Sequence, residues 1–187
     1  RPVGAPHSEA RVALDPNVAS EEGVWALKSA KLSPEGRFMA YQYAKAGSDW
    51  AEIKVRDLMT GQDLIDHLEW VKFSGISWAK DGSGFYYSRY DAPKEGEALT
   101  GVNYYQKLYF HTLHSPQTED TLIYVRSDQK EWGFDGHVSE DGRLLIISVW
   151  QGASEKNQVF YKRLDRPHSP VTPLVDNFEA SFSFLGN

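Results

Sequence analysis

The sequence predicts an all-β fold, a partial β-propeller built from four-stranded antiparallel blades. Three observations predict it. Short apolar runs rich in Tyr, Phe, Trp, Val and Ile are separated by turns that contain glycine. A helical period of apolar residues is nearly absent. The same order of features returns three times, and the turn glycines Gly36, Gly82 and Gly142 lie 46 and 60 residues apart, a spacing typical of propeller blades.

Each repeat contains four predicted strands. The first is a short apolar strand before the turn, in which we expect Leu32, Ile76 and Val138 to be equivalent. A second apolar strand follows each turn, at residues 38–43, 85–90 and 144–149. A third strand alternates and ends in leucine, at residues 51–58, 106–113 and 157–164. A weaker fourth strand closes each repeat, at residues 63–68, 121–125 and 171–175.

These strands divide the chain into three blades, at about residues 25–70, 71–126 and 133–177, within one propeller domain over residues 1–187. Residues 11–14 are expected to be the last strand of an earlier blade, and residues 178–185 the first strand of a later one. Because propellers need at least four blades to close, we expect the chain to be part of a longer protein. A β-sandwich with a chance repeat is the alternative fold.

Composition excludes several classes of function. The chain has 187 residues, of which 41% are apolar, enough to build a packed core. Its 20 basic and 26 acidic residues give a formal charge of -6, which argues against binding to nucleic acid or to a membrane surface. The chain has no cysteine, which excludes disulfides, thiolate catalysis and cysteine-bound zinc. The localisation, cytoplasmic or periplasmic, stays open.

The residues themselves offer little catalytic chemistry. The pentapeptide G-x-S-x-G, which marks a serine nucleophile elbow, is absent. His111 and His114 could suggest a metal pair, but side chains three residues apart on a strand point to opposite faces, so surface or cross-strand packing is favoured. The adjacent acids at 119–120 and 140–141 fall in turns and are expected to be solvated rather than to form a glycosidase pair. We predict no metal and no cofactor.

Seven stretches, collinear over residues 10–187, resemble the prolyl oligopeptidase (prolyl endopeptidase) family of serine peptidases. The resemblance implies a seven-bladed propeller that caps an α/β-hydrolase domain, with short proline-containing peptides cut after proline in the cavity between the domains. It also implies that the catalytic Ser, Asp and His belong to the hydrolase domain, so none is expected in this chain. The similar stretches are LDPNVASEEGVWAL, SPEGRFMAYQYAKAGSDWAEIKVRDLMTGQDL, LEWVKFSGISWAKDGSGFYYSRYD, QKLYFHTL, SPQTEDTLIY, VSEDGRLLIISV and PLVDNFEASFSFLGN.

The resemblance further implies which propeller residues form the wall of the substrate cavity. Phe73 matches the family's aromatic contact for the substrate residue two positions before the proline. Two further lining segments match at Trp132-Gly133-Phe134 and at Ala153, and Trp150 falls where relatives often carry arginine. The implied substrate-contact residues are therefore Phe73, Gly133, Phe134, Trp150 and Ala153.

Asp49 and Lys72 are expected near the interface with the hydrolase domain, although a solvated turn is nearly as good an interpretation of Asp49.

Two functions remain open. The first is the propeller portion of a proline-specific oligopeptidase, which gates access and lines the substrate pocket; its partners would be short proline-containing peptides and the hydrolase domain of the same protein. The second is a stand-alone β-propeller module that binds a peptide or protein. A glycosidase propeller is a distant third.

Overall fold

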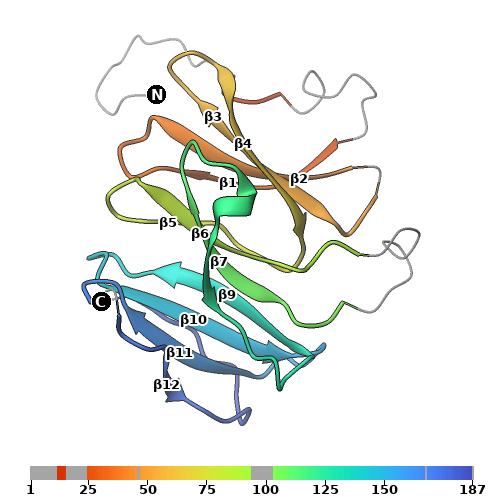
Figure 1. The fold of residues 1–187 in the computed structure, drawn as a ribbon, viewed down its shortest axis with the longest axis vertical. Helices are drawn as coiled ribbons and strands as arrows, with labels where there is room; N and C mark the ends of the chain where they lie inside the picture. Colours follow the sequence, from red (N-terminus) through yellow and green to blue (C-terminus); the bar gives the residue numbers. More distant parts are fainter. Residues whose placement is uncertain (1–11, 16–24, 46, 94–102, 167, 187) are drawn as a thin grey trace.

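The computed structural model describes residues 12–15, 25–45, 47–93, 103–166 and 168–186. They form an all-β fold with one short 3-10 helix, and Figure 1 shows the strands in three layers. The first group of strands is β1 (Trp25–Leu32), β2 (Phe38–Lys45), β3 (Ala51–Asp57) and β4 (Gln62–Val71). The second is β5 (Ser77–Trp78), β6 (Gly84–Arg89), β7 (Lys107–Thr112) and β8 (Thr121–Tyr124), with η1 (Gln117–Glu119) before β8. The third is β9 (Trp132–Val138), β10 (Leu144–Gln151), β11 (Asn157–Arg163) and β12 (Thr172–Val175). None of the described helices is long and apolar enough to cross a membrane.

Hydrogen bonding joins these strands into two antiparallel sheets. The first sheet has the order β1-β2-β3-β4-β6-β7-β8, with β5 paired to β6, and the second has the order β12-β11-β10-β9. Within the first sheet, β4 meets β6 through one residue pair only, Val71 with Arg89. It therefore consists of two four-stranded parts, which confirms the predicted architecture of four-stranded antiparallel sheets.

The first hairpin of each group has the same turn. The residue before the turn pairs with the residue seven positions later in all three, as Leu32 does with Met39, Trp78 with Phe85 and Val138 with Leu145. The turn glycine of each hairpin has a φ of 72–74°, in the left-handed region that glycine adopts without steric cost. The predicted equivalence of Leu32 and Val138 is confirmed. The assignment of Ile76 is wrong, because the register places Trp78 at that position.

The leucine that ends each third strand closes the repeat in the same way. The backbone N–H of Leu58, Leu113 and Leu164 donates to the carbonyl of the residue that follows the turn glycine, at 2.8–2.9 Å. The pairing across the turn and the hydrogen bond from the leucine both recur in all three groups, which supports a true structural repeat. We propose that the three groups are the blades expected at about residues 25–70, 71–126 and 133–177.

The two predicted outer strands do not form in the described residues. Arg11 lies outside them, and residues 12–14 adopt no strand. Residues 178–185 are also without strand pairing. Instead, the carbonyl of Phe182 accepts from the Asn157 side chain, and its N–H donates to the same side chain. A strand needs a neighbour to complete its backbone hydrogen bonds, and an apolar sequence alone does not supply one.

A buried polar cluster connects the first and second strand groups. His111 on β7 is fully buried, with its Nδ1 2.6 Å from Asp120 Oδ1 and its Nε2 2.9 Å from Asp66 Oδ1. The Tyr87 hydroxyl donates to the other oxygen of Asp120 at 2.5 Å. Burial lowers the pKa of His111, but hydrogen bonds to the two carboxylates raise it, and the result is about 9. His111 therefore packs across strands, as the sequence favoured. The expectation that Asp120 is solvated is wrong, because the Asp120 side chain is fully buried.

Candidate functional site

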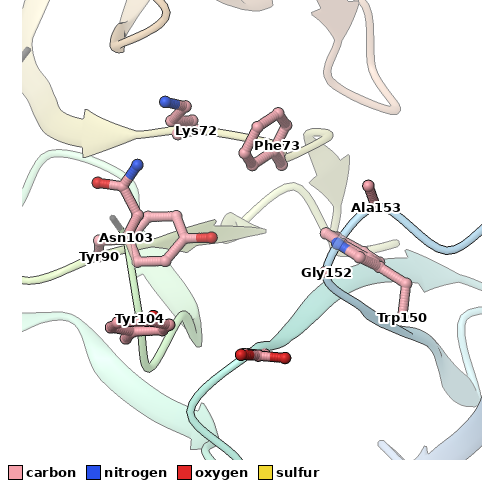
Figure 2. Close-up of a pocket in the computed structure, with 9 residues that line it drawn as sticks. Lys72, Phe73, Tyr90, Asn103, Tyr104, Trp150, Gly152 and Ala153 are labelled. Atoms are coloured by element: carbon pink, nitrogen blue, oxygen red, sulfur yellow. The ribbon is translucent and has the colours of Figure 1, made fainter. Parts of the chain in front are cut away.

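A pocket of about 590 Å³ lies where the ends of the second and third strand groups meet the segment after β4. It brings together four residues singled out from the sequence, which are Lys72, Phe73, Trp150 and Ala153. Figure 2 shows the rings of Phe73, Tyr104 and Trp150 facing the same space, with Ala153 at its edge. The other lining residues, which sequence reasoning did not identify, are Tyr90, Asn103, Tyr104, Glu131 and Gly152.

Phe73 follows the end of β4 and is presented to solvent, with 63% of its surface exposed. Its φ of 52° lies in the left-handed region, which is costly for a bulky residue and persists only when neighbouring contacts hold it. The amide Nε2 of buried Gln106 donates to the carbonyl of Lys72 at 2.7 Å and to that of Phe73 at 3.3 Å. The same side chain accepts from the Phe134 N–H at 2.6 Å. Gln106 thus ties Phe73 to β9.

A second tie holds the residues just after Phe73. The N–H of Gly75 donates to Asp135 Oδ1 at 2.8 Å. A Cβ at Gly75 would lie 2.9 Å from that oxygen, so glycine allows the carboxylate to approach. Burial raises the pKa of Asp135, and the hydrogen bond from Gly75 opposes that shift. The segment that carries Phe73 is therefore fixed to the third strand group at two points.

Trp150 forms the opposite wall of the pocket and depends on Gly133. The two residues are paired on adjacent strands, β10 and β9. A Cβ at Gly133 would lie 2.3 Å from Trp150 Cε2, far inside van der Waals contact. Gly133 is buried and is not a lining residue, but its lack of a side chain lets the indole lie across β9.

Phe134 does not contribute its side chain to the pocket. It is 1% exposed and packs edge-on against Tyr124, with ring centroids 5.2 Å apart. Side chains of adjacent strand residues point to opposite faces, and Phe134 takes the core face. Of the two predicted contacts Gly133 and Phe134, the glycine affects the pocket, because it leaves the space in which the Trp150 indole lies.

Lys72 and Asp49 lie together on the far side of Phe73. Lys72 Nζ is 3.5 Å from Asp49 Oδ2, and it also sits 5.4 Å from the ring centroid of Trp50 and 5.3 Å from that of Phe73. The residues that line a second hollow, of about 410 Å³, include Asp49, Lys72, Phe73 and two more lysines, Lys28 and Lys31. The Phe73 ring therefore stands between a basic hollow and the pocket that contains Glu131.

Four aromatic side chains line the pocket, those of Phe73, Tyr90, Tyr104 and Trp150, and such surfaces are typical of binding sites. Its described lining residues include no serine, cysteine, threonine or histidine. Burial raises the pKa of Tyr90, which keeps its hydroxyl protonated. Among the described residues, one group has a spacing that could hold a metal, Glu52 with His67 and Glu69, and none of the three lines this pocket. In that group Glu52 is already engaged by Lys45 and by His67.

The chain is similar to known proteins over nearly its whole length. Residues 2–187 match the family model described as the prolyl oligopeptidase N-terminal β-propeller domain. The chain is 36% identical over 174 residues to a prolyl endopeptidase of Elizabethkingia miricola, covering 93% of this chain and 24% of that protein. It is 33% identical over 191 residues to a dual function macrocyclase-peptidase of Galerina marginata, covering 94% of this chain and 26% of that protein. The chain thus spans about a quarter of the length of these relatives.

Solved structures give the same result. One, from a structural and mechanistic study of two prolyl endopeptidases, matches all of this chain and 26% of its own chain with a TM-score of 0.88 and 33% identity. Another is prolyl oligopeptidase B from Galerina marginata bound to a 35mer hydrolysis and macrocyclization substrate. It matches 92% of this chain and 26% of its own, with a TM-score of 0.83 and 29% identity.

Proposed function

The chain belongs to the prolyl oligopeptidase family, within that family's N-terminal β-propeller domain, and from this membership we propose that it is the propeller portion of a proline-specific serine oligopeptidase. In this function the chain lines the substrate pocket and controls access to it. Short proline-containing peptides are the substrates, and cleavage follows the proline. The hydrolase domain of the same protein is the chain's permanent partner.

One observation carries the proposal. Phe73, Trp150 and Ala153, which are far apart in the sequence, line one open pocket, and Phe73 is held there in a conformation that costs free energy. Residues held in costly backbone conformations cluster at active sites and ligand-binding segments. A peptide that lies along this wall would place the side chain two positions before the proline against Phe73.

The chemical steps belong to residues outside this chain. The serine of the hydrolase domain attacks the carbonyl carbon of the proline. The histidine takes the serine proton and passes it to the leaving amine, and the aspartate orients the histidine. What the propeller adds is position, because an immobilised peptide reaches the reacting geometry more often than a free one. Asp49 and Lys72, at the exposed side of Phe73, would face the hydrolase domain.

Access is the second part of the proposed role. A propeller that covers a buried site excludes folded proteins and admits short peptides when the two domains separate. Such opening can limit turnover without any change in the chemical step.

The test compares this chain with the complete protein that contains it, using a chromogenic Gly-Pro peptide. We expect the complete protein to cleave the peptide after proline and the chain alone to show no cleavage. Activity of the purified chain would contradict the placement of the triad elsewhere. A complete protein that lacks a serine elbow after residue 187 and binds proline peptides without cutting them would instead support a stand-alone binding module.

A further inference from the structure

Among the described residues, two charged side chains line the pocket beside Phe73, those of Lys72 and Glu131. Lys72 has its ammonium 3.5 Å from Asp49 and close to two aromatic rings. Figure 2 shows the Lys72 nitrogen pointing away from Tyr104 and Trp150. The remaining charge is the carboxylate of Glu131, which is exposed and has no ion pair with another described residue. Glu131 is therefore the charged lining residue, among those described, that no ion pair neutralises.

The backbone holds Glu131 between two aromatic walls. The N–H of Gly152 donates to the Glu131 carbonyl at 3.1 Å, which joins it to the turn that follows Trp150. The N–H of Tyr105 donates to the carbonyl of the preceding residue, Lys130, at 2.8 Å. Glu131 is thus fixed to both the Tyr104 segment and the Trp150 segment, rather than carried on a free loop.

The walls themselves favour a cation. Aromatic faces attract ammonium and guanidinium groups, more strongly when a carboxylate lies nearby and water is partly excluded. The protein already places its own cations beside two of the pocket's rings, with Lys72 Nζ 5.3 Å from the ring centroid of Phe73 and Lys130 Nζ 4.6 Å from that of Tyr104. Among the described residues, the Trp150 ring has no such partner, and it faces the same space as Glu131.

We propose that this pocket selects peptides with a cationic side chain two residues before the proline, and that Glu131 is the specificity-determining residue. The inference rests on the proposed function, because it assumes that a peptide lies along Phe73. A lysine or arginine side chain would cover the Phe73 and Trp150 rings with its apolar stem and place its charge near the Glu131 carboxylate. A glutamate at the same substrate position would be repelled.

The test uses the complete protein and three capped peptides, acetyl-Xaa-Gly-Pro-nitroanilide with Xaa as lysine, norleucine or glutamate. Norleucine matches the lysine stem without the charge. We expect lysine to exceed norleucine in kcat/KM by roughly fivefold, mainly through KM, and glutamate to be the poorest. In Glu131→Gln the lysine preference should fall below about twofold, and it should also weaken at high salt. Glu140→Gln, at the other end of β9, is the matched control and should keep the preference.

Two outcomes would overturn the inference: equal kcat/KM for lysine and norleucine in the unmodified protein, or a lysine preference that persists in Glu131→Gln. Cleavage of norleucine and lysine peptides at equal rates would leave the proposed peptidase function standing. Absence of cleavage of all three peptides would contradict the peptidase function instead. In that case calorimetry with acetyl-Lys-Gly-Pro and its norleucine counterpart decides the charge selection, and equal affinities would refute it.

Discussion

At the scale of single residues, the pocket depends on a glycine that does not touch it. Gly133 leaves space for the Trp150 indole, and the glycine and tryptophan are cross-strand partners. Any side chain at this position would compete with the indole for the same volume. Overpacking of this kind moves side chains from their preferred rotamers, with a typical cost of about 1–3 kcal/mol. Because Trp150 forms a wall of the pocket, displacement of its indole would weaken the proposed peptide binding and would also lower the free energy of unfolding.

We therefore expect Gly133→Ala to raise KM for peptides that extend beyond Gly-Pro by about tenfold, which corresponds to about 1.4 kcal/mol of lost binding. The change in kcat should be smaller. The control is Gly136→Ala on the same strand, where a Cβ would lie 3.2 Å from Leu108 and Leu145 side-chain atoms, in the core and not at the pocket. Steady-state kinetics of the complete protein measures both. A larger effect on KM from Gly136→Ala would contradict the assignment.

The site was only partly predictable from the sequence. Phe73, Trp150 and Ala153 came from resemblance to a family, and they share the pocket. Phe134 came from the same resemblance but faces the core, because neighbouring residues of a strand alternate sides. Glu131 lies outside any motif, and its part in the pocket follows from three segments meeting in space. Such contacts depend on tertiary structure, which local patterns do not encode.

At the scale of elements, the His111 cluster links β4, β6, β7 and the start of β8 by hydrogen bonds between buried groups. His111 contacts Asp66 of β4 and Asp120 next to β8, and Tyr87 of β6 reaches Asp120. A protonated His111 balances one of the two carboxylate charges. Loss of that proton would leave two buried carboxylates facing a neutral ring, which is unfavourable at low dielectric.

This cluster predicts a pH dependence of stability. The pKa of His111 is about 9 in the folded protein, against about 6.5 in an unfolded chain. A raised pKa gives stability that is fully present below about pH 6.5 and is lost as the pH rises through about 9. The free energy of unfolding of the complete protein should therefore fall by about 3 kcal/mol between these two pH values. Denaturant titrations at a series of pH values measure it.

Two variants check that His111 is the cause. His111→Gln should be less stable at neutral pH and should lose most of this slope, because glutamine does not titrate. His168→Gln, at an exposed position, should keep the slope of the unmodified protein. If the slope is the same in all three proteins, another group is responsible and folding does not raise the pKa of His111.

The strands themselves were predictable, since alternation of apolar residues and the glycine turns mark them directly. β3 shows the alternation in its burial, with every second residue buried from Ala51 to Asp57. What the pattern could not supply was pairing. Residues 178–185 are apolar enough for a strand but have no strand neighbour among the described residues. The shift from Ile76 to Trp78 has a similar origin, because register is set by the turn and not by hydrophobicity.

At the scale of the whole molecule, three four-stranded groups supply the pocket from different parts of the chain. Phe73 comes from the link between the first two groups, Tyr104 from the segment before β7, and Trp150 from the third group. The buried ties of Gln106 and Asp135 hold these parts together. These hydrogen bonds fix the pocket's segments relative to one another, as the proposed positioning of a peptide requires.

The most direct test of that account is the effect of Phe73→Ala on peptides of two lengths in the complete protein. We expect KM to rise about tenfold for peptides with a residue two positions before the proline, from loss of aromatic contact, and to change little for a minimal Gly-Pro peptide. Ile65→Ala, which removes an exposed apolar side chain that does not line the pocket, should leave both values unchanged. Equal increases of KM for the long and the minimal peptide would contradict the account, because they would show that Phe73 supports the fold and does not contact substrate.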